Sequence, residues 1–228
     1  MRILAVDTAT TNCSVAITDK AYLLAELTLN REETHSKHLM DMIDVALKLS
    51  GLNFSDMDGF ALTIGPGSFT GLRIGMSTVK GLALAFEKPV VGVSSLATLA
   101  IQVSFSPVLI CPILDARKGE VYFARYKFVN GQLKEQTKED VATPDKAVEN
   151  LNESCLFVGN GALLYKIKIL EKMGKLASFV PMNQNTIRAS TIAHIGLAKF
   201  ENNDTIDIEK ISPHYIRKSD AELNLRLT

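Results

Sequence analysis

The sequence has little cysteine and no excess of charge of either sign. The three cysteines, Cys13, Cys111 and Cys155, are odd in number and share no CxxC spacing, which argues against a disulfide framework and against a zinc site. Lysine plus arginine number 25, as do aspartate plus glutamate, and no block of five or six like charges occurs. A basic stripe for tight binding of RNA or DNA by this chain alone is therefore missing. We expect a protein of the reducing cytoplasm.

Signals for export or for a membrane are also missing. The N-terminus, MRILAVDTAT, has Asp7 inside its short apolar run, so the apolar core of a signal peptide does not fit. Residues 89–114 carry no charge, but they contain four serines, Gln102, Pro107 and Pro112. That stretch divides into strand, helix and strand, so we expect it in a protein core and not in a membrane. With 46% apolar residues in 228, the chain can bury a substantial core.

A glycine-rich run, GPGSFTGLRIG at residues 65–75, follows an apolar stretch and precedes a helical pattern. This is where α/β proteins place a helix N-terminus against an anion. A P-loop needs Gly-Lys-Ser/Thr, whereas Leu72 and Arg73 follow Gly71 here. A dinucleotide fingerprint needs a carboxylate after the next strand, whereas two serines follow residues 90–93. Both nucleotide-binding interpretations are therefore weak.

The order of expected elements repeats once along the chain. Residues 107–228 begin the pattern of the first half again, with Asn130-Gly131 as a hairpin turn. Each half reads βββαβαβα, which predicts an α/β protein of two lobes, residues 1–105 and 106–228. The expected strands are 2–7, 12–18, 21–29, 59–64, 89–93, 108–114, 120–129, 132–141, 155–158 and 178–180, and the expected helices are 36–50, 70–86, 95–104, 144–150, 161–173 and 188–201.

A duplicated βββαβαβα unit resembles the actin, Hsp70 and sugar-kinase (ASKHA) superfamily, whose lobes clamp ATP. Asp7 and Asp115 end the first strand of each half, as the acidic residues of that superfamily do. The turns that follow them lack the adjacent glycine that lets a backbone approach phosphates closely. The Gly-Asn-Gly turn at residues 159–161 resembles the adenosine-side turn, although most turn glycines are structural. We expect the clamp to be retained and its ATP chemistry to be lost.

Five segments together resemble the TsaB (YeaZ) family over residues 1–217. They are ILAVDTATTNCSVAI (3–17), HSKHLMDMIDVAL (35–47), GPGSFTGLRIG (65–75), DARKGEVYFARY (115–126) and SPHYIR (212–217). The resemblance implies the non-catalytic subunit of the bacterial machinery that makes threonylcarbamoyladenosine in tRNA. It implies as partners the catalytic paralogue TsaD, the ATPase TsaE and a second copy of the chain, with tRNA contacted only through the assembled complex. It implies no cofactor for the isolated chain, while a nucleotide can sit at the interface with the catalytic subunit.

The sequence contains no recognisable metal-binding or hydrolase motif. The catalytic paralogue has an HHxxGH-type run where residues 94–99 read SSLATL here, so no metal is expected at that place. His35 and His38 share a helical spacing, but no cysteine or clustered carboxylate completes a ligand set. Neither Gly-x-Ser-x-Gly nor His-Glu-x-x-His occurs, so a peptidase is the least favoured function.

Two expected helices carry more apolar or small surface than one core needs. A helix packed on one core requires an apolar stripe of about 100°, and the first helix exceeds it. The second brings small residues to one side, which lets another helix approach. Burial of both helices between layers of one domain is an equally good interpretation of the pattern. The resemblance favours an interface with the catalytic paralogue, formed by His35, Leu39, Met42, Ile43, Ala46, Gly71, Gly75, Thr78 and Leu82.

The favoured function is therefore a non-enzymatic scaffold for threonylcarbamoyl transfer to tRNA. The alternative from another class is a small actin-like ATPase or metabolite kinase that uses Asp7, Asp115 and the turn at 159–161. Binding of ATP and magnesium by the lone chain distinguishes the two.

Overall fold

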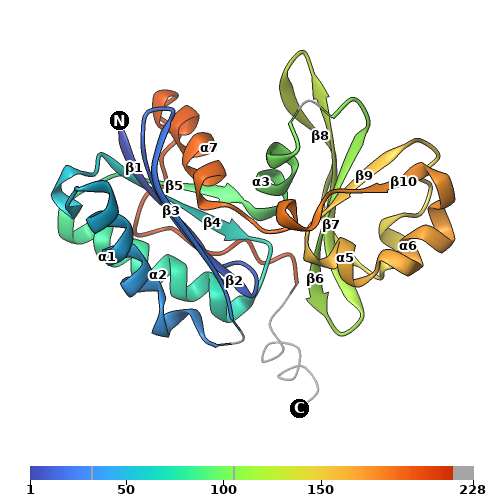
Figure 1. Cartoon of the computed structure of the whole chain (residues 1–228), viewed down its shortest axis with the longest axis horizontal. Coiled ribbons are helices and arrows are strands. Elements are labelled where there is room, and N and C mark those ends of the chain that lie inside the picture. Colours follow the sequence, from blue (N-terminus) through green and yellow to red (C-terminus); the bar gives the residue numbers. More distant parts are fainter. Residues whose placement is uncertain (32, 105, 218–228) are drawn as a thin grey trace.

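The computed structural model describes residues 1–31, 33–104 and 106–217, which form two lobes side by side (Figure 1). Each lobe is built on a five-stranded mixed sheet, with strand order β3-β2-β1-β4-β5 in the first lobe and β10-β9-β6-β7-β8 in the second. Both sheets contain an antiparallel meander followed by parallel strands. The α/β class and the repeated element order are thereby confirmed.

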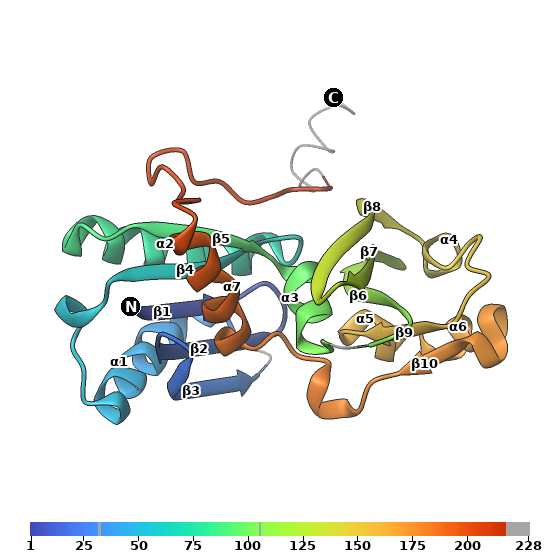
Figure 2. The ribbon, with the colours of Figure 1, turned by 90° about the horizontal axis from the view of Figure 1, so that it is seen from above.

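The first lobe has helices on both faces of its sheet (Figure 2). Leu4 and Val6 of the central strand share a core cluster with α1 and α2, whereas Ile3 and Ala5 share one with α7. This alternation follows from the two-residue period of a strand. The elements are β1 (Arg2–Asp7), β2 (Asn12–Asp19), β3 (Tyr22–Asn30), η1 (His35–Lys37), α1 (Leu39–Ser50), η2 (Phe54–Asp56), β4 (Gly59–Gly65), α2 (Phe69–Phe86), β5 (Val90–Ser94) and α7 (Ala189–Glu201).

The second lobe follows the same plan with shorter helices. Helix α3 lies between the lobes, because it contacts β6, β7 and β8 of the second sheet as well as β4 and β5 of the first. One buried cluster therefore continues from lobe to lobe. The elements are α3 (Ser95–Gln102), β6 (Leu109–Arg117), β7 (Glu120–Val129), β8 (Gln132–Ala142), α4 (Pro144–Ala147), β9 (Cys155–Val158), α5 (Asn160–Leu164), α6 (Lys166–Met173), η3 (Gly174–Leu176), β10 (Ala177–Phe179) and η4 (Met182–Gln184).

The predicted boundary between lobes at residues 105 and 106 needs a correction at the C-terminal side. Helix α7 packs on β1, β2, β4 and β5 of the first sheet. Beyond it, the backbone N–H of Ile206 donates to the carbonyl of Val90 (2.8 Å), and that of His214 donates to Ile64 (2.7 Å). Helix α7 and the backbone at Ile206 and His214 therefore pack on the first lobe, and residues 218–228 of the predicted second lobe lie outside the described residues.

Smaller differences concern helix bounds. The predicted helix 36–50 is a 3-10 turn followed by α1, and the predicted helix 161–173 is divided into α5 and α6 around Tyr165. The predicted helix 144–150 ends already at Ala147.

A half-buried carboxylate, that of Glu26, anchors the start of α7 to the edge strand β3. Glu26 accepts hydrogen bonds from the backbone N–H of Ser190 (2.9 Å), from its hydroxyl (2.6 Å) and from Nε of Arg188 (3.1 Å). The carboxylate thus satisfies one of the N–H groups that a helix start leaves without partners, that of Ser190, and meets the positive end of the helix. Burial alone would raise the pKa of Glu26, but the hydrogen bonds from Arg188 and Ser190 outweigh it and hold the pKa below its ordinary value.

Replacing this carboxylate is expected to loosen the C-terminal helix. Glu26→Gln should lower the free energy of unfolding at pH 7 by about 1–3 kcal/mol, because charge-assisted hydrogen bonds are lost. A lowered folded-state pKa means that this stabilisation exists above the ordinary carboxyl pKa and disappears as the pH falls through the folded-state value. The difference between wild type and variant in urea unfolding should therefore shrink from pH 7 to pH 4. The exposed Glu171→Gln is the control, and a loss that is equal at both pH values would contradict this assignment.

Candidate functional site

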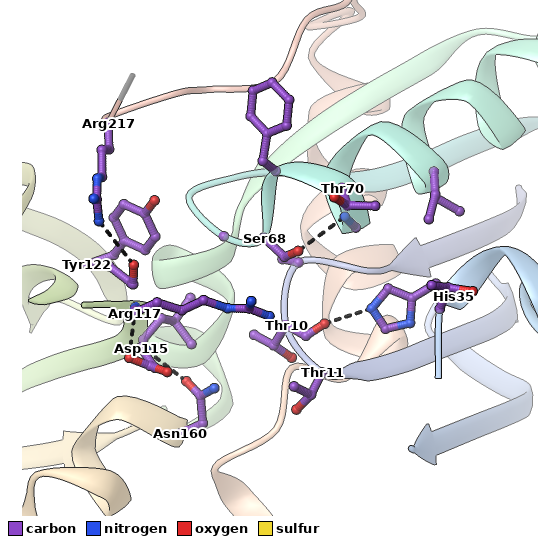
Figure 3. Close-up of a pocket in the computed structure, with 18 of the residues that line it drawn as sticks. Thr10, Thr11, His35, Ser68, Thr70, Asp115, Arg117, Tyr122, Asn160 and Arg217 are labelled. Carbon is purple, nitrogen blue, oxygen red and sulfur yellow. Dashed lines mark hydrogen bonds between the residues drawn. The ribbon is translucent and has the colours of Figure 1, made fainter. Parts of the chain in front are cut away.

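A cleft of about 760 Å³ lies between the two lobes (Figure 3). Both hairpin turns reach it, the β1–β2 turn from the first lobe and the β6–β7 turn from the second. The start of α2 and the C-terminal segment complete its walls. The lining includes Ala9, Thr10, Thr11, Arg31, His35, Ser68, Thr70, Asp115, Arg117, Lys118, Tyr122, Asn160, Tyr215 and Arg217.

Three glycines bring α2 into direct contact with the β1–β2 turn. Gly67, Gly71 and Gly75, called the glycine strip below, are four residues apart and share one side of the helix and its entry. A Cβ at Gly67 would lie 2.3 Å from the carbonyl oxygen of Ala9, one at Gly71 would lie 2.1 Å from that of Thr8, and one at Gly75 would lie 2.3 Å from Oγ1 of Thr8. Only glycine permits this approach.

Hydrogen bonds fix the same contact. The backbone N–H of Ser68 donates to the carbonyl of Ala9 (2.7 Å), and the hydroxyl of Thr8 donates to the carbonyl of Gly71 (2.8 Å). Nε2 of His35 lies 2.7 Å from the carbonyl oxygen of Thr10. The Ser68 hydroxyl caps α2 by accepting from the N–H of Gly71. The glycine-rich run thus closes the turn that in an ATP clamp would face phosphates.

This contact corrects part of the predicted partner interface. Gly71 and Gly75 are buried against Thr8 of their own lobe, so they do not provide a groove for another helix. Leu39, Ile43 and Ala46 have no exposed surface, and Met42 retains 7%, because these side chains point into the core of the first lobe. For these six residues the interpretation as interior positions is the correct one.

The rest of this face remains open. His35, Thr78 and Leu82 are half-buried. On α1 and α2 the exposed apolar side chains are Met40, Val45, Leu49 and Leu84, with exposed fractions of 46, 40, 70 and 56%. A partner could contact these four side chains. They are neighbours of the predicted interface residues, and the sequence pattern could not distinguish them from the core positions. That a partner covers them stays a prediction.

Asp7, the acidic residue at the end of β1, is buried beneath the turn and does not line the cleft. Its Oδ1 accepts from the hydroxyl of Thr63 (2.7 Å) and the backbone N–H of Ala9 (3.1 Å). Its Oδ2 has no hydrogen-bond partner within the described part of the chain. Burial raises the pKa of Asp7 to about 7, although the hydrogen bonds from Thr63 and Ala9 act to lower it.

The second lobe uses its predicted nucleotide residues for backbone packing as well. The N–H of Arg117 donates to Oδ1 of Asp115 (2.9 Å), and the N–H of Asp115 donates to Oδ1 of Asn160 (3.1 Å). Gly159 has φ +108°, and a Cβ there would lie 2.4 Å from the carbonyl oxygen of Ile113. A Cβ on Gly161 would lie 2.7 Å from the carbonyl carbon of Leu114. These glycines are required by the close approach of α5 to β6.

Basic side chains outnumber acidic ones around the cleft. Arg31, Arg117, Lys118 and Arg217 line it together with two carboxylates, Glu33 and Asp115. Arg117 reaches across the cleft from the β6–β7 turn toward Thr10 (Figure 3), and Arg217 pairs with Glu120 (3.0 Å). The cleft is therefore suited to an anionic group.

The two histidines of the predicted helix start do not converge. His35 contacts Thr10, whereas Nε2 of His38 lies 2.7 Å from the carboxylate of Glu33. Within the residues that the structure describes, no three histidine, cysteine or carboxylate side chains gather where they could hold a metal ion.

The SPHYIR segment at 212–217 was part of the family resemblance, but its contacts were not predicted from the sequence. The ring of Tyr215 stacks on Phe69 (centroids 4.7 Å apart), the guanidinium of Arg73 lies 3.8 Å over the same Phe69 ring, and Arg73 donates to the Tyr215 hydroxyl (3.0 Å). Nε2 of His214 lies 3.5 Å from the carboxylate of Glu139 on β8. The segment thus connects the start of α2 with the second lobe.

Glu139 is the centre of that connection. Its carboxylate accepts from the hydroxyls of Ser94, at the end of β5, and of Tyr126 (3.2 Å). Burial raises the pKa of Glu139, although the hydrogen bond from Ser94 and the nearby His214 act to lower it. One carboxylate therefore holds together the first sheet, the second sheet and the C-terminal segment. The SPHYIR motif was the available signal, but its partners are distant in sequence.

The two lobes, each with the same sheet plan, and the cleft between their hairpin turns form an actin-like α/β fold. A likeness to the ethanolamine utilization protein EutJ of Carboxydothermus hydrogenoformans (TM-score 0.56, 12% identity, 86% of this chain and 90% of the other) concerns the fold alone. The family described as TsaD, tRNA N6-adenosine threonylcarbamoyltransferase, matches residues 23–225.

Closer relatives narrow the class. The tRNA threonylcarbamoyladenosine biosynthesis protein TsaB of Bacillus subtilis is 31% identical, and its counterpart in Escherichia coli is 33% identical, each over 97% of this chain and 96% of the relative. The structure of YeaZ from Pseudomonas aeruginosa superposes with a TM-score of 0.79 at 27% identity, covering 94% of this chain and 99% of the other. The chain belongs to the TsaB family, as the resemblance of its motifs predicted. In the described segments no helix has the length and apolarity that a membrane crossing requires.

The glycine strip yields a paired test of packing. Gly75→Ala should lower the free energy of unfolding by about 1–3 kcal/mol, because the added methyl meets Oγ1 of Thr8. Gly81→Ala in the same helix is the matched control: a Cβ there has no described atom within 4 Å, so it should stabilise by about 0.5–1 kcal/mol through helix propensity. Urea denaturation measures both. Equal effects of the two substitutions would show that the strip does not limit packing.

The buried aspartate yields a pH-dependent test. A folded-state pKa near 7 against an ordinary value of 3.8 means that ionisation favours the unfolded chain, so stability is lost as the pH rises from about 4 to 7. Asp7→Asn removes this pH-dependent loss of stability, because asparagine does not ionise. The amide oxygen of the asparagine can keep the hydrogen bonds that Oδ1 of Asp7 accepts. The variant should gain on wild type by up to about 1.4 kcal/mol per pH unit in that range. Denaturation at several pH values, with exposed Asp41→Asn as control, measures the gain; a constant difference would rule out a neutral Asp7.

Proposed function

We propose that this chain takes part in the biosynthesis of threonylcarbamoyladenosine in tRNA, as a subunit that performs no chemistry of its own. Membership of the TsaB family supports the pathway, because the relatives in Bacillus subtilis and Escherichia coli are named for it and align over 97% of this chain. In this proposal the chain is a cytoplasmic pseudoenzyme that holds the catalytic paralogue TsaD in its active geometry.

The non-catalytic role is carried by one observation, the burial of Asp7. In an ATP clamp, the aspartate after the first strand must reach a metal–phosphate group in the cleft. Here Asp7 is fully buried before Thr8 and Ala9, the two residues that the glycine strip contacts, and burial favours the neutral carboxyl over the carboxylate. A neutral, enclosed carboxyl is a poor ligand for a divalent cation. The cleft thus retains its shape without the group that ATP chemistry needs.

The partner-binding role is assigned to the exposed side of α1 and α2. Val45 and Leu49, four residues apart on α1, expose apolar side chains there, as does Leu84 on α2. Exposed apolar side chains on helices are typical of protein–protein contacts. We assign this side to TsaD and, in the absence of TsaD, to a second copy of the chain. TsaE and tRNA then join through the assembled complex.

A second candidate function is favoured by the cleft itself. Its volume of about 760 Å³ lies in the range of small-ligand sites, and its basic side chains suit phosphates. An actin-like ATPase or kinase would bind ATP and magnesium as the lone chain, which isothermal titration would detect. A nucleotide that binds only in the presence of TsaD would instead belong to the interface between subunits.

Substitutions on α1 distinguish the scaffold function from the alternative function, an actin-like ATPase or kinase. Val45→Lys and Leu49→Lys alter exposed side chains, so melting should stay as in wild type while affinity for TsaD falls by about a hundredfold or more. Ile43→Asp, in the core, should unfold the chain instead. Tyr22→Lys, exposed on β3, is the control and should change neither property.

Calorimetry and reconstituted tRNA modification measure the outcome of these substitutions. Each α1 variant should fail to support modification in proportion to its loss of TsaD binding. Normal binding by a folded Val45→Lys, Leu49→Lys double variant would contradict the assigned face. Threonylcarbamoyl transfer or ATP turnover by the lone chain would contradict the pseudoenzyme.

A further inference from the structure

A second apolar surface lies on the other lobe and has no place in the function proposed above. Helices α5 and α6 expose Leu163, Leu164, Ile167 and Leu170, with exposed fractions of 40, 61, 74 and 40%. These four residues are called the α5–α6 patch. Helix α6 lies at the end of the molecule opposite α1 (Figures 1 and 2). A partner on the patch would therefore leave the exposed side of α1 free.

The patch is not the core-facing side of its helices. Ile169 and Met173, four residues apart, are the buried residues of α6, and they belong to the core cluster of the second lobe. Ile167 and Leu170, three residues apart, lie on another side of α6, and Leu163 and Leu164 stand at the end of α5 just before it. A helix that has already buried one stripe normally presents polar residues elsewhere. Here a second apolar stripe is presented to solvent.

Lysines surround this stripe. Lys166, Lys168, Lys172 and Lys175 are all exposed, and Glu171 is the single acidic residue between positions 160 and 176. No ion pair joins these four lysines to a carboxylate in the described chain. Lys166 lies 5.1 Å from the centroid of the Phe179 ring, and Lys168 lies 5.9 Å from that of Tyr165. The patch thus combines apolar area with a positive charge that the chain itself does not neutralise.

We infer that the α5–α6 patch docks an acidic amphipathic helix of a partner protein. Such a helix would place an apolar stripe on Leu163, Ile167 and Leu170 and its carboxylates beside the lysines, the arrangement of helix recognition by a surface groove. Charge complementarity would set its orientation and discriminate against basic partners.

Two other occupants fit the surface less well. Sequence-tolerant RNA binding relies on arginines and exposed aromatic rings for stacking, and the four flanking cations are all lysines, while Tyr165 is half-buried. Interfacial membrane helices bury a long apolar face that usually includes Trp or Phe, whereas α6 has eight residues and neither residue type.

The test uses the full chain and two synthetic helical peptides of equal length. Both carry leucines at i, i+3, i+4 and i+7, one with glutamates and the other with lysines on the flanks. The acidic peptide should bind at least about tenfold more tightly by fluorescence anisotropy. The Leu164→Ser, Ile167→Ser double variant should lose at least about tenfold of that affinity, and Lys166→Glu, Lys168→Glu should reverse the preference between peptides.

Control measurements show whether a change in peptide affinity reflects the patch and not a loss of folding or an effect on the α1 face. All altered side chains are exposed, so melting should stay as in wild type, and Tyr22→Ser, on an equally exposed apolar side chain of the first lobe, should change neither affinity. Anionic phospholipid vesicles and tRNA are tested in parallel. Equal binding of the two peptides, no binding of either, or binding only to vesicles or tRNA would overturn the inference.

A photo-crosslinking amino acid in place of Ile167 identifies the natural occupant in cells. The adduct should map to an acidic amphipathic helix of another protein, whereas adducts to lipid, to RNA or to a second copy of this chain would contradict the inference. Because Val45 and Leu49 are untouched, binding to TsaD should be unchanged in every patch variant. A failure of this inference is thus distinguishable from a failure of the proposed function.

Discussion

The contact between the glycine strip and the β1–β2 turn is the constraint on which the first lobe and the cleft depend. Carbonyl oxygens of Thr8 and Ala9 would lie within 2.3 Å of side-chain carbons at Gly71 and Gly67, so the sequence at these positions cannot vary without moving α2. Asp7, the residue before Thr8, is buried beneath the same turn, and burial raises its pKa. A run that resembles a phosphate loop therefore serves to pack the position where an ATP clamp would place its phosphates.

The two lobes are held together by connections that cross between them. Helix α3 contacts both sheets, α7 returns from the second lobe to the first, and Glu139 binds Ser94 and Tyr126 while facing His214. An ATP clamp works by opening and closing its lobes. Crossing connections of this kind favour one fixed arrangement, which suits a subunit that presents surfaces to partners. The α1 side and the α5–α6 patch lie at opposite ends of that arrangement (Figure 1).

Element types were predictable because local signals fixed them, whereas contacts between distant residues were not. Alternating apolar residues and the Asn130-Gly131 turn placed every strand within a few residues. Helix α7 packs on the first lobe partly through the contact between Glu26 and Arg188, which are 162 positions apart. The periodicity of apolar residues cannot predict a contact between such distant positions. For the site, the glycine-rich run and Asp7 were recognised, but their roles required the position of Thr8. The apolar arc of α1 could not show that Ile43 points inward while Val45 points to solvent, because both belong to the same broad stripe.

The central claim is that Asp7 is an interior residue of the first lobe and takes no part in chemistry at the cleft. The most direct test is threonylcarbamoyl transfer to tRNA, reconstituted with TsaD, TsaE and either wild type or Asp7→Asn of this chain. The account predicts the same transfer rate at saturating concentrations of both forms, because the amide can keep the hydrogen bonds from Thr63 and Ala9. A large loss of transfer by an Asp7→Asn protein that is at least as stable as wild type and binds TsaD normally would contradict it.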